Sequence, residues 1–78
     1  MKTTAYFRVV QTRSDRQLIQ ERWIRETVAN PEFRLAQADG RIRLWRRIAE
    51  FGDRYLRVVV LEDGETVHNA FFDRRFKQ

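Results

Sequence analysis

Polar and hydrophobic residues alternate through much of the second half of the chain, from Arg41 to Phe72. Successive side chains of a β-strand point to opposite faces, so this pattern predicts an antiparallel sheet with one buried face. Two Asp-Gly pairs, Asp39-Gly40 and Asp63-Gly64, separate the alternating runs and are typical of two-residue hairpin turns. The run before the second turn, Tyr55 to Leu61, is apolar on both faces at its end, which predicts a central strand.

Each turn predicts a register for its hairpin, because a two-residue turn decides which residues stand opposite one another. The resulting register sends aliphatic side chains to one face of the sheet and arginine side chains to the other. A loop at residues 49–53 reverses the chain between the two hairpins. The expected cross-strand pairs are Arg34–Trp45 and Leu35–Leu44 in the first hairpin, and Val60–Val67, Leu56–Phe71 and Tyr55–Phe72 in the second.

The N-terminal third predicts one strand and one helix. Residues Ala5–Val10 are expected to form a first strand, whose place in the sheet the sequence leaves open. Residues Asp15–Ala29 carry an apolar stripe at helical spacing, with Ser14 or Asp15 as N-cap, and a break inside this helix stays open. Asn30-Pro31 ends the helix, because the residue before a proline avoids the α region.

This order, β-α-β-β-β-β, predicts an α+β domain: a single antiparallel sheet of four to five strands with one main helix packed on one face. The 78 residues are expected to form one domain, with a basic C-terminal tail from about residue 73. Cysteine is absent, which excludes a disulfide scaffold, a thiol nucleophile and thiolate-bound zinc. No apolar run approaches the roughly 18 residues that span a bilayer, and no signal peptide is visible, so we expect a cytoplasmic protein.

The charge of the chain points to an anionic partner. Sixteen basic residues exceed eleven acidic ones, for a net charge of +5. Fourteen of the sixteen are arginines, whose flat guanidinium groups grip phosphate and stack on bases. Solvation of an ordinary outer sheet face is the alternative explanation, since edge arginines also discourage aggregation. The predicted nucleic-acid-binding residues are Arg16, Arg34, Arg41, Arg43, Trp45 and Arg47.

The same face carries candidate catalytic residues. His68 is the only histidine, so we expect neither a histidine-rich metal site nor a cofactor. With Arg57 and Tyr55 it could supply metal-independent RNA cleavage, which needs proton transfer and a cation to hold charge on the phosphate. A structural role for His68, and a clamp built from Asp73 with Arg74 and Arg75, both stay open.

Several short motifs carry a family resemblance: Arg16 opening the helix, Trp23-Ile24 with Val28-x-Asn30-Pro31 at its end, Asp39-Gly40-Arg41, and Tyr55 to Val60. Through them, residues 6–72 resemble a family of short bacterial domains of unknown function, grouped near the RelE/ParE-like toxin superfamily. The resemblance implies a small fold that in some members is encoded beside a partner protein. In characterised RelE-like relatives, basic and aromatic residues of the concave sheet cleave mRNA. Arg16, Arg41 and Arg57 match the family, whereas its frequent histidine before the helix is Thr12 here.

Two functions follow as hypotheses. The first is a toxin-like RNA-binding protein, with a metal-independent ribonuclease as its enzymatic form and a small antitoxin-like protein as its partner. The second is a non-catalytic interaction module that binds an acidic protein or nucleic acid through its basic face or an open strand edge. The nucleic-acid hypothesis requires Arg41, Arg43 and Arg57 to share one open surface and not to be locked each to a neighbouring carboxylate.

Overall fold

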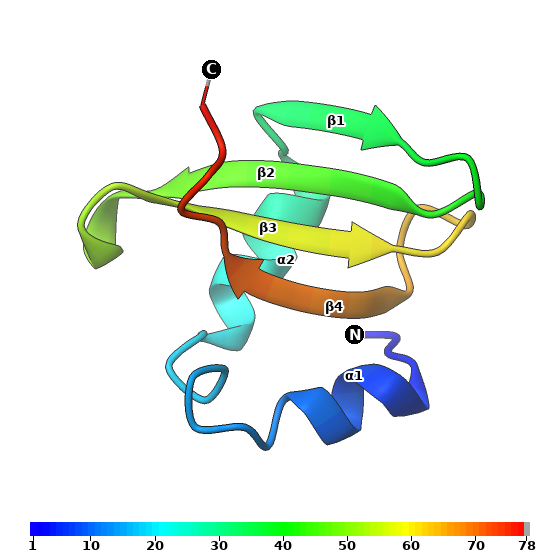
Figure 1. Ribbon diagram of the computed structural model, residues 1–78, viewed down its shortest axis with the longest axis horizontal. Helices are drawn as coiled ribbons and strands as arrows, with labels where there is room; N and C mark the ends of the chain where they lie inside the picture. The colour runs from blue at the N-terminus through cyan, green and yellow to red at the C-terminus, as the bar shows by residue number, and fades with distance from the viewer. Residues whose placement is uncertain (78) are drawn as a thin grey trace.

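Within residues 1–77, which the computed structural model describes, four antiparallel strands in sequence order form one sheet (Figure 1). The predicted α+β class is confirmed, and β3 is a central strand as predicted. The predicted loop at 49–53 contains a 3₁₀-helix. The elements are helices α1 (Ala5–Val10) and α2 (Glu21–Ala29), strands β1 (Phe33–Ala36) and β2 (Ile42–Ile48), 3₁₀-helix η1 (Ala49–Phe51), and strands β3 (Arg54–Val60) and β4 (Val67–Phe72).

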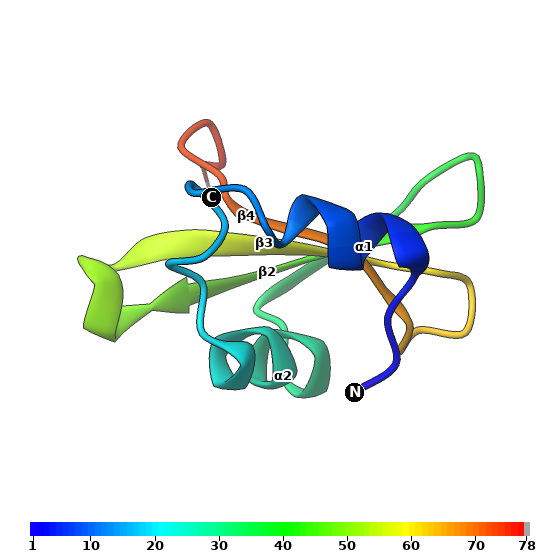
Figure 2. The same cartoon turned by 90° about the horizontal axis from the view of Figure 1, so that it is seen from below.

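Helix α2 covers one face of the sheet and closes the core (Figure 2). Trp23 and Ile24 project from it and are only 3% and 1% exposed. Thr27 is also buried, and its hydroxyl donates to the carbonyl oxygen of Trp23 at 2.8 Å, so burial leaves this polar group paired. The buried sheet residues of the core are Ile42, Leu44, Ile48, Leu56, Val58, Val60, Val67 and Ala70. Neither helix in the described part of the chain has the length and apolar character that a membrane crossing requires.

Residues Ala5–Val10, predicted as a first strand, form helix α1 instead. The Thr4 side chain caps this helix by accepting a hydrogen bond from the backbone N–H of Phe7 at 3.1 Å. Phe7 and Val10 stand three residues apart, so one helix face carries both into the interior. A short apolar run fits both the helical period of 3.6 residues and the strand period of 2. The Thr4 cap and the three-residue spacing of Phe7 and Val10 favour the helix.

The segment before α1 closes the outer edge of β4. The backbone N–H of Thr4 donates to the carbonyl oxygen of Val67 at 3.0 Å, and the N–H of Val67 donates to the carbonyl oxygen of Lys2 at 2.9 Å. The pairing is parallel and is centred on Thr3. Because an unpaired strand edge invites association with other chains, this short pairing and α1 beside it protect β4.

Helix α2 begins at Glu21, later than the predicted start at Asp15. Neither Ser14 nor Asp15 caps it; Gln20 stands at the N-cap without a side-chain bond to the helix. Its end at Ala29, just before Asn30-Pro31, agrees with the prediction. Residues 11–19 form turns, so the break that the sequence left open falls across the whole first half of the predicted helix.

Arg16 holds this turn segment against the sheet. Its guanidinium donates to the side-chain oxygen of Asn69 at 2.7 Å and to the carbonyl oxygen of Ala70 at 3.1 Å. It also lies 5.2 Å from the ring centre of Phe71. These contacts to β4 hold the segment in turns where a helix was predicted, because tertiary context readily overrides weak local propensity.

The first hairpin has a three-residue loop where a two-residue turn is predicted. The N–H of Gln37 donates to the carbonyl oxygen of Arg41 at 2.8 Å, which leaves Ala38, Asp39 and Gly40 as the loop. Gly40 has a φ of 91°, the left-handed conformation usual for the last residue of such loops. One added loop residue shifts the pairing by one and turns every β1 side chain to the other face.

The predicted pairs of the first hairpin are therefore wrong. Arg34 stands opposite Leu44, on the face that α2 covers, and Leu35 stands opposite Arg43. Leu35, expected in the core, is 51% exposed.

The second hairpin keeps its predicted register only near the turn. The pair Val60–Val67 is confirmed, and a β-bulge at His68 then shifts the rest of β4 by one residue. Phe71 consequently stands opposite Arg57 on the outer face, although the predicted register placed it in the core. The predicted pairs Leu56–Phe71 and Tyr55–Phe72 are wrong beyond the bulge, since Leu56 pairs with Phe72.

The shifted register makes a prediction about stability. Leu44→Ala, which empties a 4% exposed core position, should lower the free energy of unfolding by about 2–5 kcal/mol. The matched substitution Leu35→Ala should change it by less than about 0.5 kcal/mol, because that side chain is largely solvated. Urea unfolding of both variants measures the difference; equal losses would contradict the observed register.

Candidate functional site

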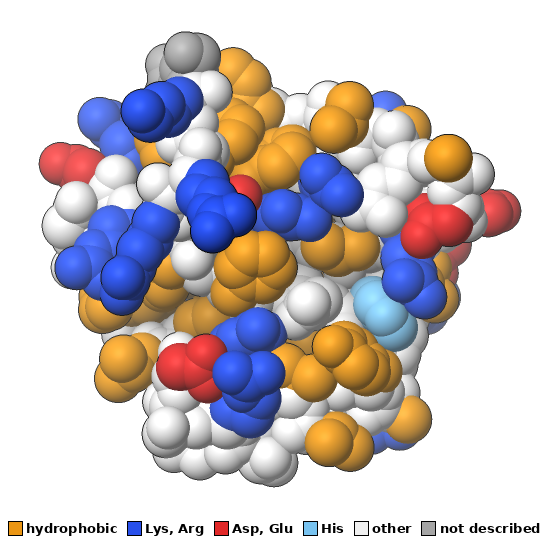
Figure 3. All heavy atoms as spheres, in the orientation of Figure 1, with side chains coloured by type: hydrophobic (Ala, Val, Ile, Leu, Met, Phe, Trp, Pro, Cys, Tyr) orange, Lys and Arg blue, Asp and Glu red, His pale blue; other side chains and the backbone are white. Residues whose placement is uncertain are grey.

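An open hollow of about 560 Å³ lies on the face of the sheet opposite α2. We call it the basin. Residues from α1, β2, β3, β4 and the first hairpin loop meet around it. In Figure 3, which views this face, lysine and arginine side chains spread across it and around the single histidine. The residues that line the basin are Tyr6, Gln37, Arg41, Arg43, Arg57, Val59, His68 and Asn69.

Strand geometry gathers three arginines in the basin. Arg41 and Arg43 are two residues apart and so face the same way, and Arg57 reaches the same hollow from β3. Burial lowers the pKa of Arg57, and the positive charge of Arg43 lowers it further. The folded sheet thus holds two like charges close together, and a bound anion would relieve their repulsion.

Neutralising contacts around these arginines are few and long. Arg57 lies 3.7 Å from Asp73, and Arg41 lies 3.7 Å from Asp39, both beyond ordinary hydrogen-bond length. Arg43 donates from Nε to the side-chain oxygen of Gln37 at 2.7 Å, which is a neutral partner. The buried Nε of Arg57 has no hydrogen-bond partner within the described residues. The buried Nε is closed to a ligand, but the long ion pairs of Arg41 and Arg57 and the neutral partner of Arg43 leave positive charge at the basin for one.

His68 stands at the rim because of the β-bulge. Its Nδ1 lies 3.0 Å from the hydroxyl oxygen of Thr4, which leaves Nε2 as the ring nitrogen for a ligand. The Tyr6 ring stacks on it with centres 4.7 Å apart and planes 21° apart. Burial, and then the charge of Arg41, lower the pKa of His68, while Asp39 acts in the opposite direction. The lowered pKa favours the neutral form of the His68 ring, which can accept a proton.

Beside the basin, three aromatic side chains form what we call the aromatic platform: Phe33, Trp45 and Tyr55. The C-terminal tail folds back across the sheet and covers it (Figure 1). Phe76 stacks on Trp45, with ring centres 4.7 Å and planes 19° apart, and its centre lies 5.2 Å from Phe33 and 5.0 Å from Tyr55. Trp45, expected to be an exposed aromatic among arginines, is 6% exposed. The tail expected from residue 73 is thus packed as far as Phe76, and Gln78 lies outside the described residues.

The basin unites only part of the predicted site. Arg41, Arg43, Arg57 and His68 line it together. Trp45 and Tyr55 belong to the aromatic platform, and Arg47, at the end of β2, lies 3.9 Å from Asp53.

Two predicted binding residues lie away from the basin lining. Arg34 is on the opposite face, because of the register shift, and Arg16 holds the turn segment to β4. Sequence reasoning missed Tyr6, Gln37 and Asn69, of which Tyr6 was assigned to a strand. The helical spacing of Phe7 and Val10 is the sequence signal that would have placed Tyr6 on a helix.

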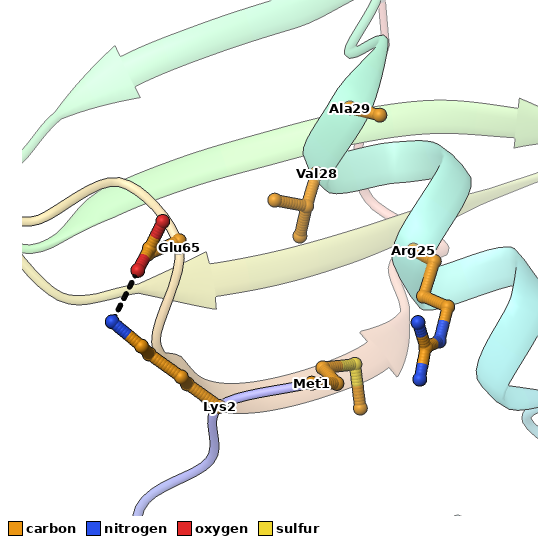
Figure 4. Close-up of a pocket in the computed structure, with 6 residues that line it drawn as sticks. All are labelled: Met1, Lys2, Arg25, Val28, Ala29 and Glu65. Atoms are coloured by element: carbon orange, nitrogen blue, oxygen red, sulfur yellow. Dashed lines mark ion pairs between the residues drawn. The ribbon is translucent and has the colours of Figure 1, made fainter.

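A second hollow, of about 460 Å³, lies between the N-terminus and α2 (Figure 4). Lys2 is paired with Glu65 across it, and Met1 and Val28 line it. Its one other charged lining residue is Arg25, so it lacks the convergence of cations that marks the basin. Among the described residues, no group of three His, Asp or Glu side chains is placed to hold a metal ion.

Comparison with known proteins leaves the site to be interpreted from its own residues. No protein-family model matches the chain, and neither a curated protein nor a solved structure matches it.

The charges around His68 predict opposite effects of two substitutions. Arg41→Gln should raise the pKa of His68, because it removes a nearby cation, and Asp39→Asn should lower it, because it removes a nearby anion. An NMR titration of the His68 ring protons measures both. Arg25→Gln, on α2, is the control and should leave the titration unchanged; an unmoved pKa in Arg41→Gln would contradict the described basin.

Proposed function

We propose that the protein is a toxin-like RNA-binding protein that holds single-stranded RNA in the basin. The observation that supports this most directly is the convergence of Arg41, Arg43 and Arg57 in one hollow with incomplete neutralisation. Guanidinium forks match phosphate oxygens in pairs, and such charge-assisted hydrogen bonds are about twice as strong as neutral ones.

The rim of the basin also suits RNA. The Tyr6 ring is 52% exposed and stacked on His68, so it offers a flat surface next to the guanidinium groups. Single-stranded nucleic acids are held by this combination of cations along the backbone and aromatic rings beneath the bases. The resemblance to RelE/ParE-like proteins agrees with it, since basic and aromatic residues of the sheet act on mRNA in the characterised relatives.

Binding should depend on salt and on particular arginines. Arg43→Ala should weaken binding of a labelled oligouridylate about 10- to 150-fold, since a charge-assisted hydrogen bond is worth about 1.5–3 kcal/mol. It should also lower the slope of log affinity against log salt by about 0.7, the value for one phosphate contact on a single strand. Fluorescence anisotropy across a salt series measures both quantities.

The matched control for this experiment is Arg25→Ala, because Arg25 is an exposed arginine on the other face of the molecule. It should alter binding and slope far less. Equal losses in the two variants would mean that overall charge, and not the basin, attracts RNA. Binding that is insensitive to salt would instead favour the alternative function, an interaction module for a protein partner.

A metal-independent ribonuclease is the enzymatic form of the proposal, favoured by the neutral His68 beside cations. In the tautomer whose Nδ1–H donates to the Thr4 hydroxyl oxygen, Nε2 of His68 would take the proton of a 2′-hydroxyl, whose oxygen then attacks the adjacent phosphorus. The bond from phosphorus to the 5′-oxygen breaks, and that oxygen takes a proton from Tyr6 or solvent. Arg57 and Arg43 stabilise the charge on the phosphate. Tyr55 was the tyrosine expected here, but it packs in the aromatic platform.

This chemistry predicts 2′,3′-cyclic phosphate and 5′-hydroxyl ends when the protein is incubated with RNA in a chelator. His68→Gln should abolish cleavage while binding is kept within about threefold, because the arginines remain. Mass spectrometry of the products measures the ends, and expression in bacteria reports on growth and RNA integrity. Intact RNA with soluble wild-type protein would remove the enzymatic form and leave the binding proposal in place.

A small partner protein completes the proposal. Strand β1 is the outer strand of the sheet and all four of its residues are exposed, including Leu35 at 51%. An open edge of this kind accepts an added strand from another chain. An antitoxin-like protein bound there would stand next to the aromatic platform.

A further inference from the structure

The C-terminal tail places two chemical groups on the sheet beside the basin. The Asp73 carboxylate accepts a hydrogen bond from the indole N–H of Trp45 at 3.1 Å and lies 3.7 Å from the Arg57 guanidinium. The Phe76 ring lies flat on the Trp45 ring. An anion and a flat ring, presented by one short segment, are also the two features that a nucleotide presents to a protein.

Arg57 joins the basin to the aromatic platform. It lines the basin, stands directly opposite Trp45 in the pairing of β2 with β3, and has its guanidinium carbon 5.8 Å from the Trp45 ring centre. An RNA strand with one phosphate in the basin would therefore bring a neighbouring nucleotide to Trp45. In the free protein, that position is taken by Asp73 and Phe76.

The end of the tail has few backbone hydrogen bonds. Asp73 continues the sheet by donating its N–H to the carbonyl oxygen of Tyr55 at 2.9 Å, whereas Phe76 has only a 3.4 Å backbone bond back to Asp73. Arg74 and Arg75 between them are exposed. A displaced tail would carry these two cations, so its release is compatible with a polyanionic ligand.

We propose that the aromatic platform is a nucleotide subsite that the tail occupies in the free protein. An RNA nucleotide would place its phosphate on Arg57 and its base on Trp45, and would displace Asp73 and Phe76. This proposal rests on the proposed RNA-binding function and adds a second subsite and an internal competitor to it.

The indole N–H signals of the two tryptophans test it in the unmodified protein. Trp45 donates to Asp73, whereas Trp23 donates to Glu50 at 3.2 Å and projects from α2 into the core on the other side of the sheet, so it serves as an internal control. A uridine octanucleotide should shift the Trp45 signal and leave the Trp23 signal in place. Inorganic tripolyphosphate, which has no base, should perturb the basin but leave the contacts between the rings of Phe76 and Trp45 in place.

Removal of the competitor gives a second readout. Phe76→Ala should raise affinity for the octanucleotide about 2- to 10-fold, because an aromatic pair is worth about 0.5–1.5 kcal/mol beyond its burial. Affinity for tripolyphosphate should stay constant. Lys77→Ala, in the same tail, is the control and should not increase affinity, and circular dichroism verifies that both variants fold.

The outcomes separate the two proposals. RNA that binds without moving the Trp45 signal, or Phe76→Ala that binds RNA more weakly than wild type, would overturn the subsite and leave the basin as the binding site. RNA that binds neither wild type nor Phe76→Ala would overturn the proposed function and the subsite together.

Discussion

The packing of α2 on one face of the sheet is the constraint from which the other features follow. Trp23 and Ile24 bury the aliphatic side chains of β2 and β3. Because successive side chains of a strand point to opposite faces, the residues that alternate with these aliphatic ones lie on the other face of the sheet. Arg43 and Arg57 must occupy the opposite face. Hydrophobic burial on one side therefore supplies the free energy that holds like charges together on the other.

The outer face is divided into two halves with different chemistry. One half is the basin, where arginine donors face a hollow and their acidic neighbours are few. The other half is the aromatic platform, which the tail covers. Arg57 belongs to both halves, with Asp73 near its guanidinium and its Nε unpaired. Binding in one half would therefore alter the contacts that Arg57 makes in the other half. A strand of RNA, the ligand that we propose, would contact both halves at once.

Most of the sheet could be predicted from the sequence because alternation and Asp-Gly turns are local signals. The limits of β2 and β3, the loop between them and the central place of β3 all follow from residues close in sequence. The grouping of Arg41, Arg43 and Arg57 needs only these strands, which is why that part of the site could be predicted.

The errors arise where a single residue sets the strand register, or where a contact between residues distant in sequence sets the local structure. Gly40 as third loop residue moves Arg34 to the other face, and the bulge at His68 moves Phe71 outward. The start of α2 depends on Arg16 reaching β4, a contact between residues 53 apart in the chain that no local pattern contains. The cover over Trp45 likewise depends on Phe76, which is remote in sequence.

The hydrogen bond between Thr4 and His68 joins residues that are 64 positions apart. Contacts of such long sequence separation form late, because closing a long loop is entropically unfavourable until other contacts have shortened it. The rim of the basin is therefore assembled only after the last strand has joined the sheet. A chain still being synthesised on the ribosome carries the arginines of β2 and β3 but not the finished basin, so a ligand that needs the complete basin can bind only after β4 has emerged.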